Sequence, residues 1–436
     1  MNTLSAICAF PLLALLDGLS VGAWIVLTGV ATNVACALVG CFLVLRRMSL
    51  MGDAISHAVL PGLVVAFLLS GSMGIVPLFV GAAALGLLTT FLTQTLHQYA
   101  RVPSDASLGV VFTSLFALGV VLVKKYMAGL HFDVACVYEG ALELAPFAQP
   151  VAGLPRPLFT TLLVLVVNLV VLVLLWKELK LSAFDASLAT TMGFSASAMH
   201  YLLMAMVAVT TVASFEAVGS ILVVAMLIVP AATAHLLTDR LSVMVVLSAV
   251  VGVAAAVVGY EAALFWDTNI AGMMTVAVGA IYGLTVLFSP RYGLISALIH
   301  NARMSLRVLR EDLLAMLYRV EELGSDKPLT ALAARKAVGG GLLARWGLAE
   351  LVRTRQIVRA GQQLRLTDQG RKAARRLVRS HRLWETYLVE QLGMPLDHVH
   401  EPAHRVEHFI DERLRQELEA QIETQGQDPH GREIPE

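Results

Sequence analysis

The chain has 436 residues, of which 57% are hydrophobic and 15% charged, with a mean hydropathy of +0.73 and a formal net charge of +0. With several apolar runs of about 20 residues, this composition argues against a soluble enzyme and indicates an integral membrane protein. Most of the charged residues follow Pro290. The chain therefore divides into an apolar part and a polar part.

The N-terminal segment MNTLSAICAFPLLALLDG is apolar but has no basic region and no small-residue cleavage motif. We therefore expect an interfacial or first membrane segment rather than a cleaved signal peptide. The four Cys form no CxxC pair and no disulfide-framework spacing. They are expected to be small buried apolar residues: Cys8, Cys36, Cys41 and Cys136.

Apolar runs predict nine membrane helices, or eight if two are re-entrant, at 24–45, 54–69, 75–92, 108–123, 159–176, 199–212, 217–236, 243–258 and 273–288. Basic residues follow the first, third, fifth, seventh and ninth of these ranges. The positive-inside rule places those loops, and the polar C-terminal part, in the cytoplasm. Lys124 and Lys125 fall on the predicted outer side and conflict with this assignment.

The stretch GDAISHAVLPG places an acid and an imidazole at the start of the second range. Asp53 and His57 are i, i+4 on one helix face and suit a shared divalent ion. Pro61 has no N–H to bond the His57 carbonyl, so a backbone oxygen is freed beside the pair. Ionisable residues in a span suggest function. The alternative, an acid stabilised by the helix dipole and a hydrogen-bonded interior His, stays open.

The motif LVLRRMSLMGDAISHAVLPG, followed by EAVGSILVVAMLIVPAATAHLL, closely resembles the zinc/manganese/iron-uptake family of ABC-transporter permeases, over roughly residues 24–290. The resemblance implies that Asp53 and His57 contact the metal on its way through a bacterial inner membrane. It also implies an ATPase subunit, an extracytoplasmic metal-binding protein and a second permease subunit, identical or paralogous. Glu216 stands where an uncharged polar residue is expected, and either a water-facing helix end or a gating role would explain it.

No G-x-x-x-x-G-K-[ST] motif occurs, so we expect a permease subunit rather than an enzyme, with ATP hydrolysed by another chain. Pro230 is expected to end or kink an apolar run, and AATAHLLTDRLS to form a short helix after it. By similarity to ABC importers, the segment carrying His235, Asp239 and Arg240 would dock on the ATPase; an ordinary loop is the alternative. A second candidate, KELKLSAFDASLATTMGFSAS, is amphipathic and suits the lipid interface.

The polar part, residues 299–436, is expected to form a domain separate from a membrane domain of residues 1–298. Periodicity predicts helices at 308–323, 328–338 and 342–353, and RTRQIVRAGQQLRLT predicts a β-hairpin. These elements suggest a winged helix-turn-helix over residues 306–367. A basic amphipathic helix capped by Thr367 then opens a further helical part, residues 368–436.

Potential metal ligands gather near the C-terminus, where six of the 12 His follow Ser380. Helical spacing places four side chains on an arc of about 100°: His400, His404, Glu407 and His408. His381 and Glu385 form another i, i+4 pair. One such pair alone is usually a surface salt bridge, but six such side chains on adjacent helices favour metal binding.

The pattern LTDQGRKAARRLVRSHRLWETYLVEQLG, with HVHEPAHRVEH and DPHGREIP, closely resembles the iron/manganese-dependent repressor family of metal sensors over about residues 309–435. His404 stands where relatives usually carry Cys or Glu, which favours zinc or manganese. The resemblance implies two sites: a primary one at Asp312, His404, Glu407 and His408, and an ancillary one at His381, Glu385 and His400.

Sequence-specific DNA binding is not expected, although six side chains offer a basic face: Arg335, Lys336, Arg345, Arg353, Arg355 and Arg359. The presumed recognition helix opens with three Gly and lacks the Ser, Thr, Asn or Gln that read base edges. Three functions compete: an ABC permease for manganese, zinc or iron with a metal-sensing cytoplasmic domain, a membrane-anchored transcription regulator, and an ion-coupled secondary carrier. The sequence does not choose among the three metals.

Overall fold

The computed structural model describes residues 20–71, 75–126, 142–151, 153–324, 329–422 and 426–435. Two compact units meet between Ser296 and Ala297, a boundary that falls inside helix α15 (Leu294–Glu322). The N-terminal segment expected at the membrane, with Cys8, and the position of Cys136 lie outside the described residues. Cys36 and Cys41 are buried, as expected.

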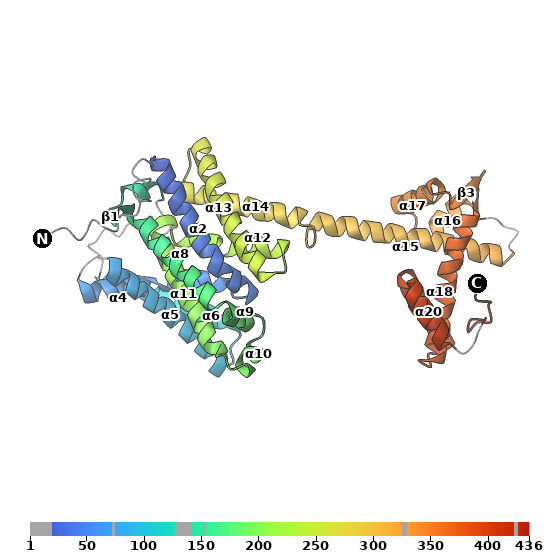
Figure 1. The fold of residues 1–436 in the computed structure, drawn as a ribbon, viewed down its shortest axis with the longest axis horizontal. Helices are drawn as coiled ribbons and strands as arrows, with labels where there is room; N and C mark the ends of the chain where they lie inside the picture. The colour runs from blue at the N-terminus through green and yellow to red at the C-terminus, as the bar shows by residue number, and fades with distance from the viewer. Residues whose placement is uncertain are drawn as a thin grey trace. The chain divides into compact units, whose positions relative to one another are not determined.

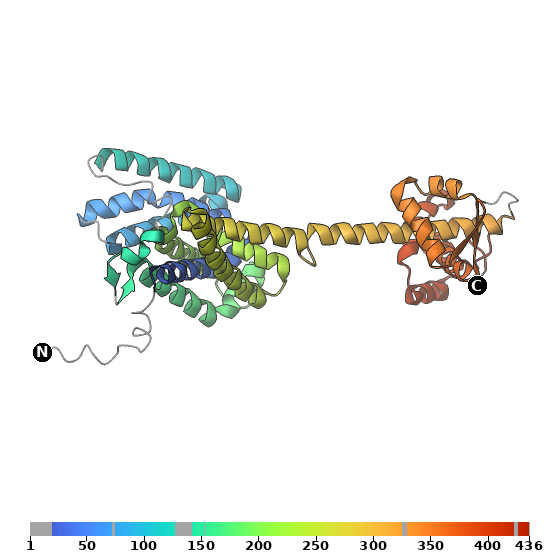
Figure 2. The same cartoon turned by 90° about the horizontal axis from the view of Figure 1, so that it is seen from above.

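The first unit is a bundle of helices (Figures 1 and 2). A short 3-10 helix, η1 (Leu142–Phe147), and an antiparallel pair of two-residue strands, β1 (Pro150–Val151) and β2 (Leu154–Pro155), precede α8. The helices are α2 (Val21–Leu45), α3 (Leu50–Ala58), α4 (Leu60–Ser70), α5 (Ile75–Tyr99), α6 (Ser104–Tyr126), α8 (Arg156–Leu174), α9 (Trp176–Phe184), α10 (Ala186–Thr191), α11 (Ala196–Val218), α12 (Ser220–Leu237), α13 (Leu241–Trp266) and α14 (Ile270–Phe288).

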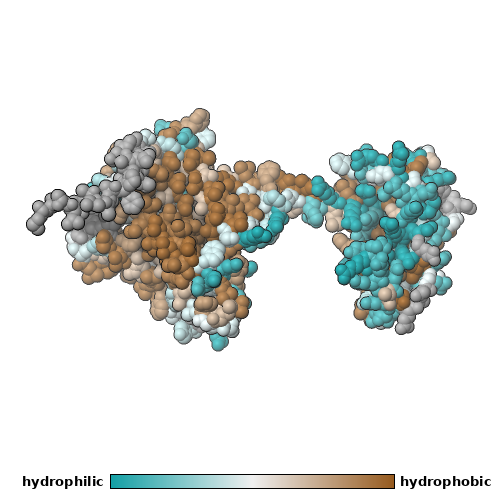
Figure 3. Space-filling model, in the orientation of Figure 1, coloured by the Kyte–Doolittle hydropathy of each residue, from teal (hydrophilic) through white to brown (hydrophobic). Residues whose placement is uncertain are grey.

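All nine predicted apolar ranges fall on helices of this unit. Within the described chain, eight helices are long and apolar enough to cross a membrane, with α3 and α4 counted together as Leu50–Ser70. The ninth, α12, is apolar over the shorter stretch Leu222–Leu237. Figure 3 shows hydrophobic residues over most of the visible face of this unit, where lipid would lie. The predicted class, a polytopic all-α membrane protein, is confirmed.

Helix α2 forms the centre of the bundle and packs against α8, α11, α12 and α13. Its C-terminal half is buried, including Phe42. Gly40 permits this packing, because a Cβ there would lie 1.7 Å from the Leu227 carbonyl oxygen of α12. Polar side chains of α2 bond to its own backbone, as Asn33 Nδ2 does to the Gly29 oxygen at 3.0 Å. These bonds satisfy side-chain donors of α2 within the helix itself.

The second unit has the predicted order of three helices, a hairpin and a long helix. Thr367 caps that long helix, since its Oγ1 accepts a hydrogen bond from Gly370 N–H at 3.1 Å. Leu313 and Leu317 of α15 share a core with Leu351 and Ile357. After α15 come α16 (Ala331–Ala337), α17 (Gly341–Arg353), β3 (Ile357–Ala360), β4 (Gln363–Leu366), α18 (Asp368–Glu390), α19 (His400–Val406) and α20 (Glu412–Gln421).

The predicted start of the first of these helices, residue 308, is wrong. α15 begins at Leu294. The residues between 294 and 308 include no Gly or Pro, so nothing in them ends a helix. The helix therefore begins directly after Gly293, shortly beyond the last apolar helix, α14.

Candidate metal sites

Asp53 and His57 lie on one face of α3 in the membrane unit. His57 Nε2 is 3.5 Å from Asp53 Oδ1, and the side chains are 32% and 45% exposed respectively. The His57 ring centroid lies 6.1 Å from that of Phe112 and 5.8 Å from that of Phe116, both in α6. An imidazole nitrogen and a carboxylate oxygen are thus within reach of one divalent ion, beside an aromatic wall.

The helix breaks just beyond this pair. α3 ends at Ala58, and α4 begins at Leu60 with Pro61 in its first turn. Because proline has no N–H, the His57 carbonyl lacks its usual helical donor. α6 passes close by, since a Cβ on Gly119 would lie 2.8 Å from Pro61 Cδ. The break therefore leaves the His57 carbonyl oxygen without its helical hydrogen-bond donor.

No third His, Cys, Asp or Glu completes a cluster with this pair among the residues that the structure describes. Sites that hold a divalent ion firmly supply three or four protein ligands, or more. A pair with one carbonyl holds an ion more loosely. Such a site suits an ion in transit.

Glu216 is not isolated in the bundle. Its Oε1 lies 3.1 Å from Arg156 Nε, and each side chain is about one-third exposed. Glu216 stands near the end of α11 and Arg156 at the start of α8. The ion pair therefore joins two helix ends, which fits the helix-end interpretation of this acid.

The segment expected to dock on an ATPase is built differently from the prediction. α12 continues through Pro230 to Leu237, so an end at Pro230 and a separate short helix after it are wrong. The proline removes one backbone hydrogen bond, but packing of α12 against α2, α13 and α14 keeps the helix intact. His235 lies in its last turn, and Asp239 and Arg240 belong to the short link before α13.

Asp239 ties this link to the chain that follows α14. Its carboxylate pairs with Arg291, and its Oδ1 accepts a hydrogen bond from Tyr292 Oη at 3.1 Å. Arg240 and His235 are exposed. Asp239 therefore positions the link, whereas the other two side chains face outward.

The second docking candidate consists of α9 and α10. Arg46, directly after α2, donates hydrogen bonds to the Ser182 carbonyl at 3.1 Å and to Ser182 Oγ at 2.9 Å. Leu179 is buried in the core of the bundle. This segment is therefore anchored to the helices rather than resting only on lipid.

Four of the expected ligands in the second unit meet at one point. Asp312 comes from α15 and His404 from α19, while Glu407 and His408 come from a 3-10 helix, η3 (Glu407–Phe409). Their ligand atoms all lie within 4.8 Å of one another. His404 Nδ1 is 2.8 Å from Glu407 Oε1, and His408 Nε2 is 3.3 Å from Asp312 Oδ1. Side chains more than ninety residues apart thus form one cluster.

The predicted continuous helical arc from His400 to His408 is wrong beyond Val406, where α19 gives way to η3. The tighter 3-10 turn buries Glu407 and His408, while His404 is half exposed. Ile410, just after this turn, packs into a core with Leu383 and Leu418. Burial of Ile410 explains why the chain departs from the regular helix.

The remaining three expected ligands form a second cluster: His381, Glu385 and His400. Glu385 Oε1 lies 3.1 Å from His381 Nε2 and 2.9 Å from His400 Nδ1. Glu407 joins the two clusters, because its Oε2 is 2.7 Å from His381 Nδ1. Burial alone would raise the pKa of Glu385, but His381 and His400 outweigh it and lower the pKa to about 2.

The geometry of these clusters fits bound metal. Four buried atoms make no well-directed hydrogen bond: Asp312 Oδ1, His381 Nδ1, Glu407 Oε2 and His408 Nε2. His381 Nδ1 and Glu407 Oε2 are nevertheless only 2.7 Å apart. Buried polar atoms are nearly always hydrogen-bonded, so atoms that are close but poorly directed suggest ligands that face a common ion. Imidazole nitrogens and carboxylate oxygens suit manganese, iron or zinc.

Metal binding at the primary cluster is expected to release a proton. Burial lowers the pKa of His408, but the carboxylates of Asp312, Glu311 and Glu407 outweigh it and raise the pKa to about 9. A metal ligand must be deprotonated, so apparent affinity should fall about tenfold for each pH unit below that value. Calorimetric titration in two buffers of different ionisation enthalpy should show about one proton released at pH 7. An affinity that is constant from pH 6 to 8 would contradict this.

Glu311 is a participant that sequence reasoning missed. Its Oε2 lies 2.8 Å from His408 Nδ1, and its Oε1 lies 3.0 Å from Arg307 Nε. It stands beside Asp312, and its i, i+4 relation to Arg307 reads as an ordinary helix-surface pair. Only the fold shows that it orients a ligand.

The fold and these clusters define a multi-pass membrane protein joined to a metal-binding domain. Residues 20–289 match the ABC 3 transport family, and the chain belongs to this family. Residues 367–436 match the iron dependent repressor, metal binding and dimerisation domain. Both resemblances drawn from the sequence are confirmed.

Curated relatives match the membrane part. The manganese transport system membrane protein MntD of Bacillus subtilis is 46% identical over 66% of this chain and 98% of its own. The zinc transport system membrane protein TroD of Treponema pallidum is 39% identical over 62% of this chain and 75% of its own. The solved structure of PsaBC from Streptococcus pneumoniae in complex with Fab aligns with a TM-score of 0.55 and 30% identity, over 64% and 95% of the two chains.

Proposed function

We propose that this chain is the permease subunit of an ATP-driven importer of a divalent transition metal, and that its C-terminal domain senses the same class of ion and regulates transport. One observation carries the proposal: a permease-family bundle with Asp53 and His57 at a helix break shares its chain with two clusters of metal ligands. Manganese and zinc are the favoured cargo, because relatives carry those names. Iron remains compatible with the ligand types.

The transporter needs further subunits. The absence of a phosphate-binding loop motif in the sequence supports ATP hydrolysis by a separate ATPase subunit. An extracytoplasmic metal-binding protein delivers the ion, and a second permease subunit, identical or paralogous, completes the pathway. The distribution of Lys and Arg supports a cytoplasmic location for the C-terminal domain.

Arg240→Glu is expected to reduce co-purification of the ATPase subunit about tenfold, because like charges across an interface cost several kcal/mol. Arg240 is exposed on the link between α12 and α13. Arg101→Glu is the matched control, since Arg101 is an exposed cation in another loop predicted to be cytoplasmic. Equal co-purification by the Arg240 variant and the parent would remove this link from the interface.

The second unit is suited to regulating the transporter rather than to reading DNA. The presumed recognition helix, α17, begins at Gly341 directly after Gly339 and Gly340, and all three glycines have positive φ. It exposes Leu342 (71%) and Trp346 (68%), whereas base edges are read by polar side chains. The transcription-regulator alternative would regain support from metal-dependent retention of this protein on a specific DNA sequence.

Regulation would act through α15. A bound divalent ion would neutralise the clustered carboxylates and join α15 to the η3 turn. Asp312 provides the ligand from α15, and His404, Glu407 and His408 provide those from the other side. Because α15 begins shortly after α14, restraint of this helix at high cytoplasmic metal is a direct route to the permease.

Metal content tests this proposal. The purified protein, equilibrated with equal manganese, zinc and iron(II) and then freed of excess ion, should retain a transition metal in the second unit. Asp312→Asn should remove most of it, whereas Asp397→Asn, an exposed acid outside both clusters, should not. Equal metal content in these two variants would exclude the primary site.

A further inference from the structure

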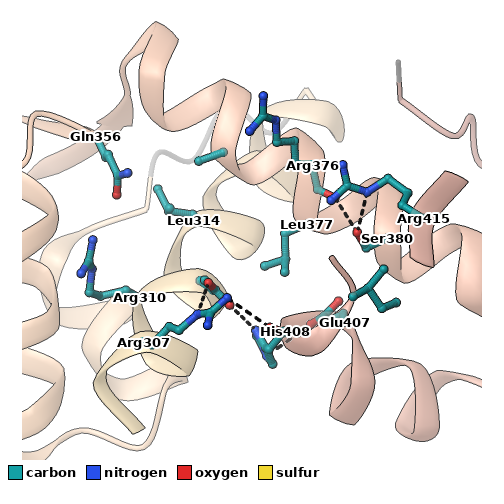
Figure 4. Close-up of a pocket in the computed structure, with 13 residues that line it drawn as sticks. Arg307, Arg310, Leu314, Gln356, Arg376, Leu377, Ser380, Glu407, His408 and Arg415 are labelled. Carbon is teal, nitrogen blue, oxygen red and sulfur yellow. Dashed lines mark hydrogen bonds and ion pairs between the residues drawn. The ribbon is translucent and has the colours of Figure 1, made fainter. Parts of the chain in front are cut away.

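A pocket of about 540 Å³ lies inside the second unit, beside the primary cluster (Figure 4). Residues of α15, α18, η3 and α20 form its wall, and Glu407 and His408 belong both to this wall and to the cluster. The volume is that of a site for a small organic molecule. Nothing in the proposed metal chemistry accounts for it.

The pocket is rich in cations. Four arginines line it: Arg307, Arg310, Arg376 and Arg415. The two acids that also line it already have partners, because Glu311 pairs with Arg307 and His408, and Glu407 pairs with His381 and His404. Arg415 pairs with Glu412, which lies outside the lining, at 2.9 Å. The excess positive charge of the lining therefore lies on Arg310 and Arg376.

Several polar groups of the lining are unpaired. Arg376 is an exposed member of the lining. Arg310 Nε and Gln356 Oε1 are buried without a hydrogen bond. Groups of this kind are costly unless something satisfies them. Arg310 Nε indicates a ligand group that accepts a hydrogen bond, and Gln356 Oε1 indicates one that donates a hydrogen bond.

Figure 4 shows Arg310 and Gln356 on one side of the pocket and Arg376, Ser380 and Arg415 on the other, with Leu314 and Leu377 between them. Guanidinium groups bind phosphate through paired N–H donors. The leucines and Ile410 offer an apolar surface to an organic group. We propose that this pocket binds an organic phosphate of nucleotide type, with Arg376 on the phosphate and with Arg310 and Gln356 facing the organic group.

The pocket is connected to the metal ligands by a short chain of contacts. Arg307 Nε lies 3.0 Å from Glu311 Oε1, and Glu311 Oε2 lies 2.8 Å from His408 Nδ1. A phosphate that attracts Arg307 competes with Glu311 and so changes how His408 is held. Anion and metal binding are therefore linked, and each alters the affinity of the other by the same factor. This linkage rests on the proposed metal site, whereas the anion site itself does not.

Calorimetry on the full-length, metal-free permease without any ATPase tests the anion site, with AMP and inorganic phosphate as probes. AMP should bind, and Arg376→Gln should weaken it about tenfold or more, because charge-assisted hydrogen bonds are lost. Arg413→Gln is the matched control, since Arg413 is 88% exposed on α20 and pairs with Glu417 outside the pocket. No saturable binding of AMP up to about 1 mM, or equal binding by parent and Arg376→Gln, would overturn the proposal.

Two further results test separate parts of this proposal: the organic nature of the ligand and the independence of the anion site from the metal site. Inorganic phosphate that binds as tightly as AMP would overturn the assignment of an organic ligand. Asp312→Asn, which lies outside the lining, should keep AMP binding while losing the effect of manganese on it. Loss of AMP binding in this variant, with its thermal unfolding unchanged, would overturn the independence of the two sites.

Discussion

Replacing Asp53 by Asn, or His57 by Ala, is expected to lower metal uptake at least about 100-fold, since even changes behind metal ligands cost 10–100-fold in affinity. The two side chains are 3.5 Å apart on α3, and no third ligand side chain within the described chain would substitute for either. Initial rates of radioactive manganese and zinc uptake in intact cells provide the measurement. Membrane insertion and association with the ATPase should be unchanged.

The matched controls are His97→Ala and Asp105→Asn. His97 lies near the end of α5 and Asp105 in the first turn of α6, so each resembles its counterpart in residue type and in its place near a helix end. Both variants should transport at the rate of the parent. Normal uptake by the Asp53 and His57 variants would return the pair to a structural role, an acid in the first helical turn and an interior histidine.

A double replacement, His404→Ala with His408→Ala, should leave uptake unchanged at low internal metal and remove inhibition at high internal metal. These side chains are two of the three that meet Asp312 of α15, so the restraint on that helix is lost. We expect uptake at high internal metal to exceed that of the parent about tenfold, because allosteric couplings are commonly 1–3 kcal/mol. Uptake into vesicles preloaded with graded manganese gives the inhibition curve.

His398→Ala is the control for this experiment. His398 lies close in sequence to the second cluster, but it is 70% exposed and pairs with Asp397. Its inhibition curve should match that of the parent. If the double variant also gives the parental curve, the second unit does not regulate transport.

The sequence was informative where the structure depends on a residue and its near neighbours along the chain. Long apolar runs identified the helices of the first unit, since only a helix satisfies its own backbone in lipid. The two ligand clusters could also be anticipated, because helical spacing groups His381 with Glu385 and resemblance supplied Asp312. The contact between the two clusters through Glu407 and His381 could not be anticipated, because it depends on how α18 and η3 pack.

Tertiary contacts decided the features that the sequence did not show. Pro230 suggested a break, but packing on three neighbouring helices keeps α12 continuous. Asp239 is exposed, but the sequence did not show its hydrogen bond with Tyr292 or its ion pair with Arg291. The arginine-lined pocket has no sequence signature, because its residues come from α15, α18, η3, α20 and the link at Gln356, which only folding brings together.

The energy source for transport tests the central claim most directly. Right-side-out membrane vesicles that contain the permease, its ATPase and the extracytoplasmic binding protein would be loaded with ATP or left without it, with and without a proton gradient. The account predicts that radioactive manganese or zinc accumulates only with ATP inside, and that collapse of the proton gradient leaves the rate unchanged. Accumulation driven by the proton gradient without ATP would contradict it and identify an ion-coupled carrier.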